Sequence, residues 1–234
     1  MMKPLYLLTA ALLTGAASAA TIITETFSMN SSVLIPDDDL VGVVQTINAS
    51  TTLASLDLVT VNLTTTGGWN GDLYVYLWHE GVLTVLVNRP GRTATALDGS
   101  AVSGMTVHFM DAAATDIHNA SGPFTGDFQP DGRAVLPTLA LDTSPRTDTL
   151  ADFLTTNPGG DWKLFIADAA GGDEATLVSW SISLTGPQSI PEPGSGLLII
   201  GALCWRLRRR QGGAHTTLRD LKNHDANNSL ILWK

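Results

Sequence analysis

Aspartates in predicted loops are the residues of this chain best suited to chemistry. Asp111, Asp168 and Asp173 each end a predicted strand or lie in a turn, where their carboxylates would converge. Calcium binds six to eight hard oxygen ligands of this kind in proteins. No EF-hand spacing occurs, so these three residues are the candidate ligands of a calcium site. The alternative is that they cap turns and keep the surface soluble.

Nucleophilic catalysis finds no support in the sequence. None of the five histidines follows a zinc-ligand spacing, and Cys204 is the single cysteine. Serine is abundant, but no Gly-x-Ser-x-Gly elbow is present. We therefore predict no catalytic residue and no enzyme activity. The histidines His79, in a turn, His108, on a strand, His118, His215 and His224 are expected to be structural or solvent-exposed.

The charge is strongly asymmetric. Residues 20–190 contain five basic and nineteen acidic residues, a net charge of −14, whereas the whole chain of 234 residues has −9. Such a surface repels phosphate backbones, which argues against nucleic acid as a partner. No disulfide is available in this region, so a hydrophobic core must stabilise it.

The N-terminus has the pattern of a secretory signal peptide over residues 1–19. Lys3 precedes an apolar stretch, and small residues end it, with cleavage expected between Ala19 and Ala20. We expect the mature chain to be exported.

Period-two hydrophobicity dominates residues 20–187. In "TLVSWSISL", Val178, Trp180, Ile182 and Leu184 alternate with serines, and Gly, Asn and Asp turns separate such runs. We predict an all-β fold, a jelly-roll-like antiparallel β-sandwich, flanked by an N-terminal signal helix and a short C-terminal hydrophobic helix. Trp162 and Trp180 are expected in its core. The stretch 147–154 is the only convincing helical window.

The stretch "DLYVYLW" carries apolar or aromatic residues on both faces. Leu73, Val75 and Leu77 alternate with Tyr74, Tyr76 and Trp78. The pattern predicts a central strand covered on both faces, with the aromatic rings beneath the second sheet. If the rings were exposed instead, they would suit carbohydrate binding.

Four ordered blocks within residues 24–185 resemble the P domain, or Homo B domain, of subtilisin-like proprotein convertases. They are "NGDLYVYLWHEG", "VLVNRPG", "VHFMDAAATDI" and the closing "LADFLTTNPGGDWKLFIADAAGGDEATLVSWSISL". The chain departs from the family in two loops, at Gly67-Gly68 and at Ala175. The resemblance implies a galactose-binding-like sandwich that accompanies, but does not contain, a serine protease.

A second resemblance lies in residues 188–210. Pro191, Glu192 and Pro193 precede a short apolar run and the cluster Arg208, Arg209 and Arg210. The apolar run is shorter than the roughly 20 residues that span a bilayer. This order resembles the PEP-CTERM sorting signal of Gram-negative bacteria, which implies transient membrane insertion and processing by an exosortase-type enzyme. Residues 211–234 form a polar tail with no predicted role.

Together these features predict a non-catalytic module at the cell surface, outer membrane or extracellular matrix. It would bind a surface protein, including a protease, or an extracellular polysaccharide. One alternative is an accessory domain that takes part in proteolysis by subtilisin-like serine proteases. A second alternative is a structural matrix protein without a specific ligand.

Overall fold

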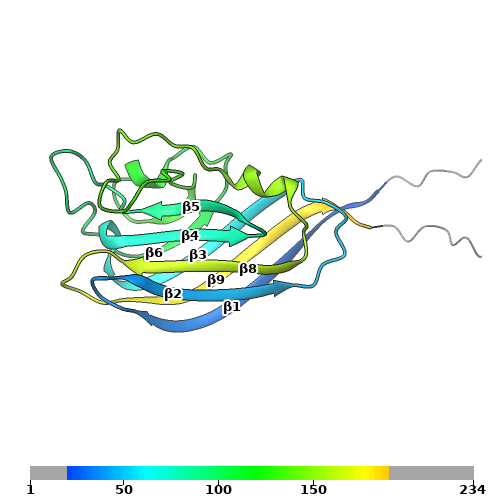
Figure 1. Cartoon of the computed structure of the whole chain (residues 1–234), viewed down its shortest axis with the longest axis horizontal. Helices are drawn as coiled ribbons and strands as arrows, with labels where there is room; N and C mark the ends of the chain where they lie inside the picture. The colour runs from blue at the N-terminus through cyan, green and yellow to red at the C-terminus, as the bar shows by residue number, and fades with distance from the viewer. Residues whose placement is uncertain (1–19, 190–234) are drawn as a thin grey trace, which may run out of the picture. The chain divides into compact units, whose positions relative to one another are not determined.

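A computed structural model describes residues 20–189 as two β-sheets packed face to face (Figure 1). This confirms the predicted all-β sandwich. The strands are β1 (Ile22–Ile35), β2 (Asp39–Ala49), β3 (Leu58–Trp69), β4 (Leu73–His79), β5 (Val82–Asn88), β6 (Ser103–Phe109), β7 (Thr125–Phe128), β8 (Gly160–Asp168) and β9 (Ala175–Pro187).

The strands divide into a five-stranded and a four-stranded sheet. The first has the order β1-β9-β3-β6-β7 and the second the order β2-β8-β4-β5. All neighbours are antiparallel except β6 and β7, which run parallel. The parallel pair arises because the long connection after β6 returns β7 in the same direction.

The core lies between the sheets and contains both predicted tryptophans. Trp162 and Trp180 are completely or almost completely buried. One detail of the β9 pattern differs from the prediction: the register shifts beside Val178, so Leu177 takes the buried position and Val178 does not. A β-bulge of this kind reverses the facing of residues on one side of it.

Within the part of the chain that the structure describes, helical structure is limited to three short 3-10 turns. They are η1 (Asn70–Asp72), η2 (Ile117–Asn119) and η3 (Leu150–Thr155). The helical window predicted over 147–154 corresponds to η3, which begins with a capping box formed by Thr149 and Asp152.

The signal peptide, its cleavage position at Ala19, the sorting signal and the polar tail lie outside the described residues. Residues 20–189 contain no helix long and apolar enough to cross a membrane. At the two ends of this region, Ile22 pairs with Pro187, so β1 begins where β9 ends.

Candidate functional site

The outer face of the four-stranded sheet carries the aromatic residues of β4. Leu73, Val75 and Leu77 point into the core and are fully buried, whereas Tyr74, Tyr76 and Trp78 alternate with them and are only half-buried. The prediction that the second sheet covers these rings is wrong. The second sheet packs on the other face of β4, because a strand presents alternate residues to opposite sides.

Rings from neighbouring strands pack together on this face. Tyr76 of β4 stacks on Phe165 of β8, with 4.6 Å between ring centroids and 12° between planes. The ammonium group of Lys163 lies 4.9 Å from the centre of the Trp78 ring. Stacked aromatic pairs and a cation over an indole ring both stabilise such an arrangement.

A glycine makes room for this packing. Gly42 in β2 has φ of +56°, and a Cβ atom there would lie 2.9 Å from the ring of Phe165. The ring therefore extends over β2 where any other residue would collide with it. Sequence reasoning missed Phe165, although "LFIAD" places it two residues from Lys163 on the same side of the strand.

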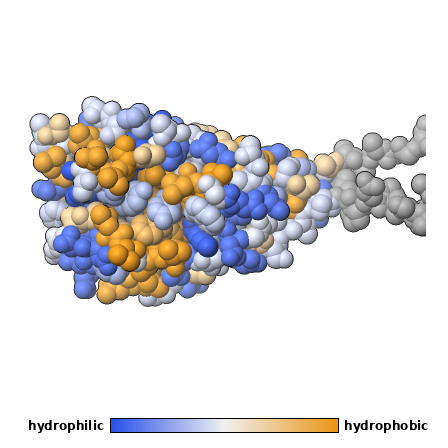
Figure 2. All heavy atoms as spheres, in the orientation of Figure 1, coloured by the Kyte–Doolittle hydropathy of each residue, from blue (hydrophilic) through white to orange (hydrophobic). Residues whose placement is uncertain are grey.

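These side chains line a shallow depression of about 250 Å³, here called the aromatic hollow. Its residues come from all four strands of the sheet: Val44, Tyr76, Trp78, Leu83, Lys163 and Phe165. Hydrophobic residues gather over this face in the space-filling view (Figure 2). Val44 and Leu83 are 53% and 38% exposed, and nearby Val41 is 80% exposed. The sheet thus presents apolar side chains to solvent from a rigid scaffold.

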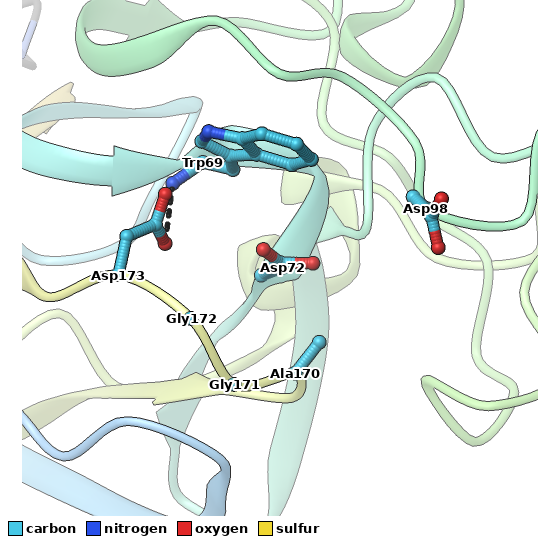
Figure 3. A pocket seen from close by; sticks show the side chains of 7 residues that line it. All are labelled: Trp69, Asp72, Asp98, Ala170, Gly171, Gly172 and Asp173. Atoms are coloured by element: carbon cyan, nitrogen blue, oxygen red, sulfur yellow. Dashed lines mark hydrogen bonds between the residues drawn. The ribbon is translucent and has the colours of Figure 1, made fainter.

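A second depression, of about 500 Å³, lies where β3, β4 and β8 meet the loop that joins β8 to β9 (Figure 3). It is lined by Trp69, Asp72, Asp98 and residues 170–173. The carboxylate of Asp173 accepts a hydrogen bond from the backbone amide of Trp69 at 3.2 Å. Among the predicted calcium ligands, Asp173 therefore already serves to fix a loop.

Asp168 lies at the same end of the sandwich and is fully buried. Its Oδ1 accepts a hydrogen bond from the amide of Ala170, while its Oδ2 has no partner. Burial, together with the negative charges of Asp72, Asp37 and Asp173, raises the pKa of Asp168 to about 6, against the lowering effect of the Ala170 bond. Burial also raises the pKa of Asp72 despite its ion pair with Arg89.

Asp111 lies elsewhere, so the three predicted calcium ligands do not converge. Its two carboxylate oxygens accept hydrogen bonds from the amides of Leu150 and Ala151, at the start of η3. The pairing of β3 with β6 explains the separation: Asp111 follows Phe109, which is opposite Val61, whereas Asp173 contacts Trp69, eight residues further along β3. Within residues 20–189 no group of three or more His, Cys, Asp or Glu side chains is placed to hold a metal ion. Calcium binding stays a prediction, now limited to Asp168 and Asp173.

A buried charged network that the sequence did not reveal joins the loops beside β5. His118 is fully buried, with Nδ1 2.9 Å from the carboxylate of Asp131 and Nε2 3.0 Å from the carbonyl of Arg92. Both partners are acceptors, so the ring satisfies them only when it carries both protons. Burial lowers the pKa of His118, but the hydrogen bond and charge of Asp131 outweigh it and raise the pKa overall.

Arg133 completes the network. Its guanidinium donates to the carboxylates of Asp116 and Asp131 and to the carbonyls of Leu141 and Asp142. Three of the five basic residues within residues 20–190, Arg89, Arg92 and Arg133, are buried. Their role is to hold loops in place.

The other described histidines also have structural contacts. His79 ends β4 instead of lying in a turn, is buried, and stacks on Trp162 with 3.9 Å between ring centroids. Its two ring nitrogens face the carbonyls of Asp161 and Asn157. His108 lies on β6, as predicted, beside Asp127. Within residues 20–189 no histidine is hydrogen-bonded to a serine hydroxyl.

Comparison with known proteins gives limited likeness. No family model matches the sequence, and no curated protein matches it. A crystal structure of the Aeromonas sobria serine protease with the chaperone ORF2 is similar at 15% identity and a TM-score of 0.41, over 72% of this chain and 28% of that one. A structure of the A. sobria serine protease is similar at 14% identity and a TM-score of 0.40, over 75% of this chain and 29% of that one. A structure of dimeric latent PorU from Porphyromonas gingivalis is similar at 11% identity and a TM-score of 0.34, over 74% of this chain and 14% of that one.

The chain thus spans less than a third of the length of each of these structures. At these TM-scores the likeness carries no argument about function. The function of this chain has to be sought in its own residues.

Proposed function

We propose that this protein is an exported, non-catalytic module that binds an extracellular or cell-surface partner through the aromatic hollow. The observation that carries the proposal is the half-exposed row Tyr74, Tyr76 and Trp78 on the outer face of the sheet, with Phe165 and Lys163 beside it. Aromatic side chains combine large apolar area with polar groups, and they are enriched in binding surfaces.

Contact of the side chains of the aromatic hollow with water costs free energy, and the fold does not depend on these side chains being apolar. Val44 and Leu83 line the hollow beside the partly buried rings and are exposed, so apolar side chains from several strands face solvent around it. Burying apolar surface is favourable by about 25 cal/mol per Å². Ligand sites are typically concave and lined by hydrophobic and aromatic side chains with a few polar groups, which is the composition of the aromatic hollow.

The rest of the proposal concerns location and partners. The signal peptide and the sorting signal predicted from the sequence are the support for export, with an exosortase-type enzyme as the processing partner and the surface of a Gram-negative cell as the destination. The resemblance to the P domain supports a serine protease as the class of protein partner. A purely structural role in the matrix is the alternative if the hollow proves to bind nothing.

The test measures retention of purified protein on the extracellular fraction of the producing cells. Trp78→Ala removes the largest ring of the hollow, and Trp69→Ala is the matched control because Trp69 is exposed outside it. We expect Trp78→Ala to lose retention and Trp69→Ala to keep it. Equal retention of both variants would contradict the proposal. Fluorophosphonate labelling of the same protein should mark no serine, and a labelled serine would refute the non-catalytic assignment.

A further inference from the structure

We infer that the ligand of the aromatic hollow is a neutral polysaccharide, bound along β2 and β8. The inference rests on the proposed function and adds the chemical class of the ligand. It is carried by a polar row that continues from the hollow along the same face, and by the size and charge of the surface.

The polar row follows directly from the strand register. Along β8, Phe165, Lys163 and Asp161 lie on one face at two-residue intervals, and their partners on β2 are Val44, Thr46 and Asn48. The surface therefore changes from apolar to polar over about 13 Å, at ~3.3 Å per residue. Thr46, Asn48 and Asp161 are exposed.

The polar groups offer both donors and acceptors. The amide of Asn48 donates to the carboxylate of Asp161 at 2.7 Å, which holds both side chains in place on the sheet. Lys163 supplies donors and Thr46 a hydroxyl. A sugar hydroxyl is both donor and acceptor, and it can bond to each of these groups. The apolar face of a sugar ring packs on aromatic side chains such as Tyr76 and Trp78.

The size of the surface favours a chain-like ligand over a globular one. Three strand spacings of ~4.8 Å give about 14 Å across, so the hollow and polar row occupy on the order of 200 Å². A stable protein–protein interface buries about 800 Å² on each partner. The hollow itself, at about 250 Å³, is smaller than the ~300–1,000 Å³ of typical sites for drug-sized ligands. One or a few sugar rings fit this scale.

Charge decides between neutral and acidic polymers. Lys163 and Asp161 balance each other on the face, while the surrounding residues 20–190 have a net charge of −14. An acidic polymer is longer than the reach of the single ammonium group of Lys163. Its other charges would be repelled by the negative charges of the protein, which act over ~10 Å at 0.1 M salt. A neutral polymer meets no such repulsion.

The experiment is affinity electrophoresis of the purified protein in native gels that contain hydroxyethyl cellulose, laminarin, galactomannan or alginate. Two matched pairs of variants are compared. Trp78→Ala and Asn48→Ala change the face. The controls are Trp69→Ala, which changes a residue outside this face, and Asn62→Ala, which removes an exposed asparagine hydrogen-bonded to Ser181 on the other sheet.

We expect retardation by at least one neutral polymer, with the dissociation constant raised about tenfold or more by Trp78→Ala, as the loss of ~1.4 kcal/mol of contact would give. Asn48→Ala should weaken it as well, and the two controls should match the unchanged protein. Urea denaturation of each variant shows whether a loss of binding reflects loss of folding.

Other outcomes overturn the inference and separate it from the proposed function. Retardation by alginate alone refutes a neutral ligand. If no polymer binds, but Trp78→Ala still loses retention on the extracellular fraction, the inference of a neutral polysaccharide fails and the proposed function stands. Self-association that Trp78→Ala abolishes, measured by sedimentation velocity, assigns the face to a second copy. If Trp78→Ala changes none of these, both the inference and the proposed function are wrong.

Discussion

Asp168 allows a quantitative test of how burial acts on this fold. Its carboxyl is fully buried, its Oδ2 has no hydrogen-bond partner, and its pKa is about 6 against 3.8 for an unperturbed group. The folded state therefore holds a proton that the unfolded chain releases at lower pH. Since one pKa unit corresponds to about 1.36 kcal/mol, titration of this group changes the free energy of unfolding by about 3 kcal/mol.

The sign follows from proton linkage. Between the unfolded pKa and the folded pKa the native state binds more protons, so stability falls as pH rises through this window. We expect the unchanged protein to lose about 3 kcal/mol between pH values well below 4 and well above 6 because of Asp168 alone. Asp168→Asn removes the titration but keeps an oxygen that accepts from Ala170.

The assay is urea denaturation of both proteins in EDTA at several pH values from 3.5 to 7.5. The quantity to follow is how the difference in unfolding free energy between the two proteins changes with pH. An effect of the new amide that does not depend on pH shifts this difference equally at every pH and leaves its change with pH unaffected. Asp57→Asn is the control, since Asp57 is exposed and its charge is not among those that act on Asp168. A difference that stays constant within about 0.5 kcal/mol across this range would refute the assignment of a raised pKa to a buried, unpaired carboxyl.

Three further predictions concern the buried charges and calcium. Arg133→Ala should cost about 3–5 kcal/mol in urea denaturation, because it removes the buried guanidinium that pairs with both Asp116 and Asp131. Arg146→Ala, with a more exposed side chain, should cost less, and equal losses would contradict this. The His118 ring should titrate in NMR spectra with a pKa above its ordinary value. Its contribution to stability should be complete below the unfolded pKa of about 6.5 and should disappear as pH rises through the folded pKa. A titration midpoint below the ordinary value would show that burial outweighs the effect of Asp131. If calcium binds near Asp168 and Asp173, excess EDTA should lower the melting temperature and Asp168→Asn should abolish that effect; an unchanged melting temperature would remove calcium from the account.

The sheet framework was predictable because period-two hydrophobicity is local information. Trp162, Trp180 and the alternating residues of β4 lie as their spacing indicated. The facing of Val178 was not predictable, because a bulge shifts the register without a mark in the residue types. The fate of Tyr74, Tyr76 and Trp78 could not be decided either, since apolar side chains on both faces of a strand fit a covered sheet and a binding face equally well.

The sequence also did not predict which residues of the candidate sites contact one another. Asp168 and Asp173 come from the same loop region and do lie at one end, but Asp111 belongs to the opposite end because of strand pairing that only the fold reveals. Phe165 joins the aromatic hollow through the missing side chain of Gly42, and His118 meets Asp131 across loops thirteen residues apart. Such contacts depend on tertiary packing and have no periodic signature.

The central claim is that ligand binding occurs on the outer face of the sheet β2-β8-β4-β5. Chemical-shift mapping by NMR tests it most directly: the isotope-labelled protein is titrated with the polysaccharide fraction of the producing cells. The account predicts that the largest shift changes fall on Val44, Tyr76, Trp78 and Leu83. Changes centred instead on Trp69 and Asp173, or on the opposite sheet at Asn62, would contradict it.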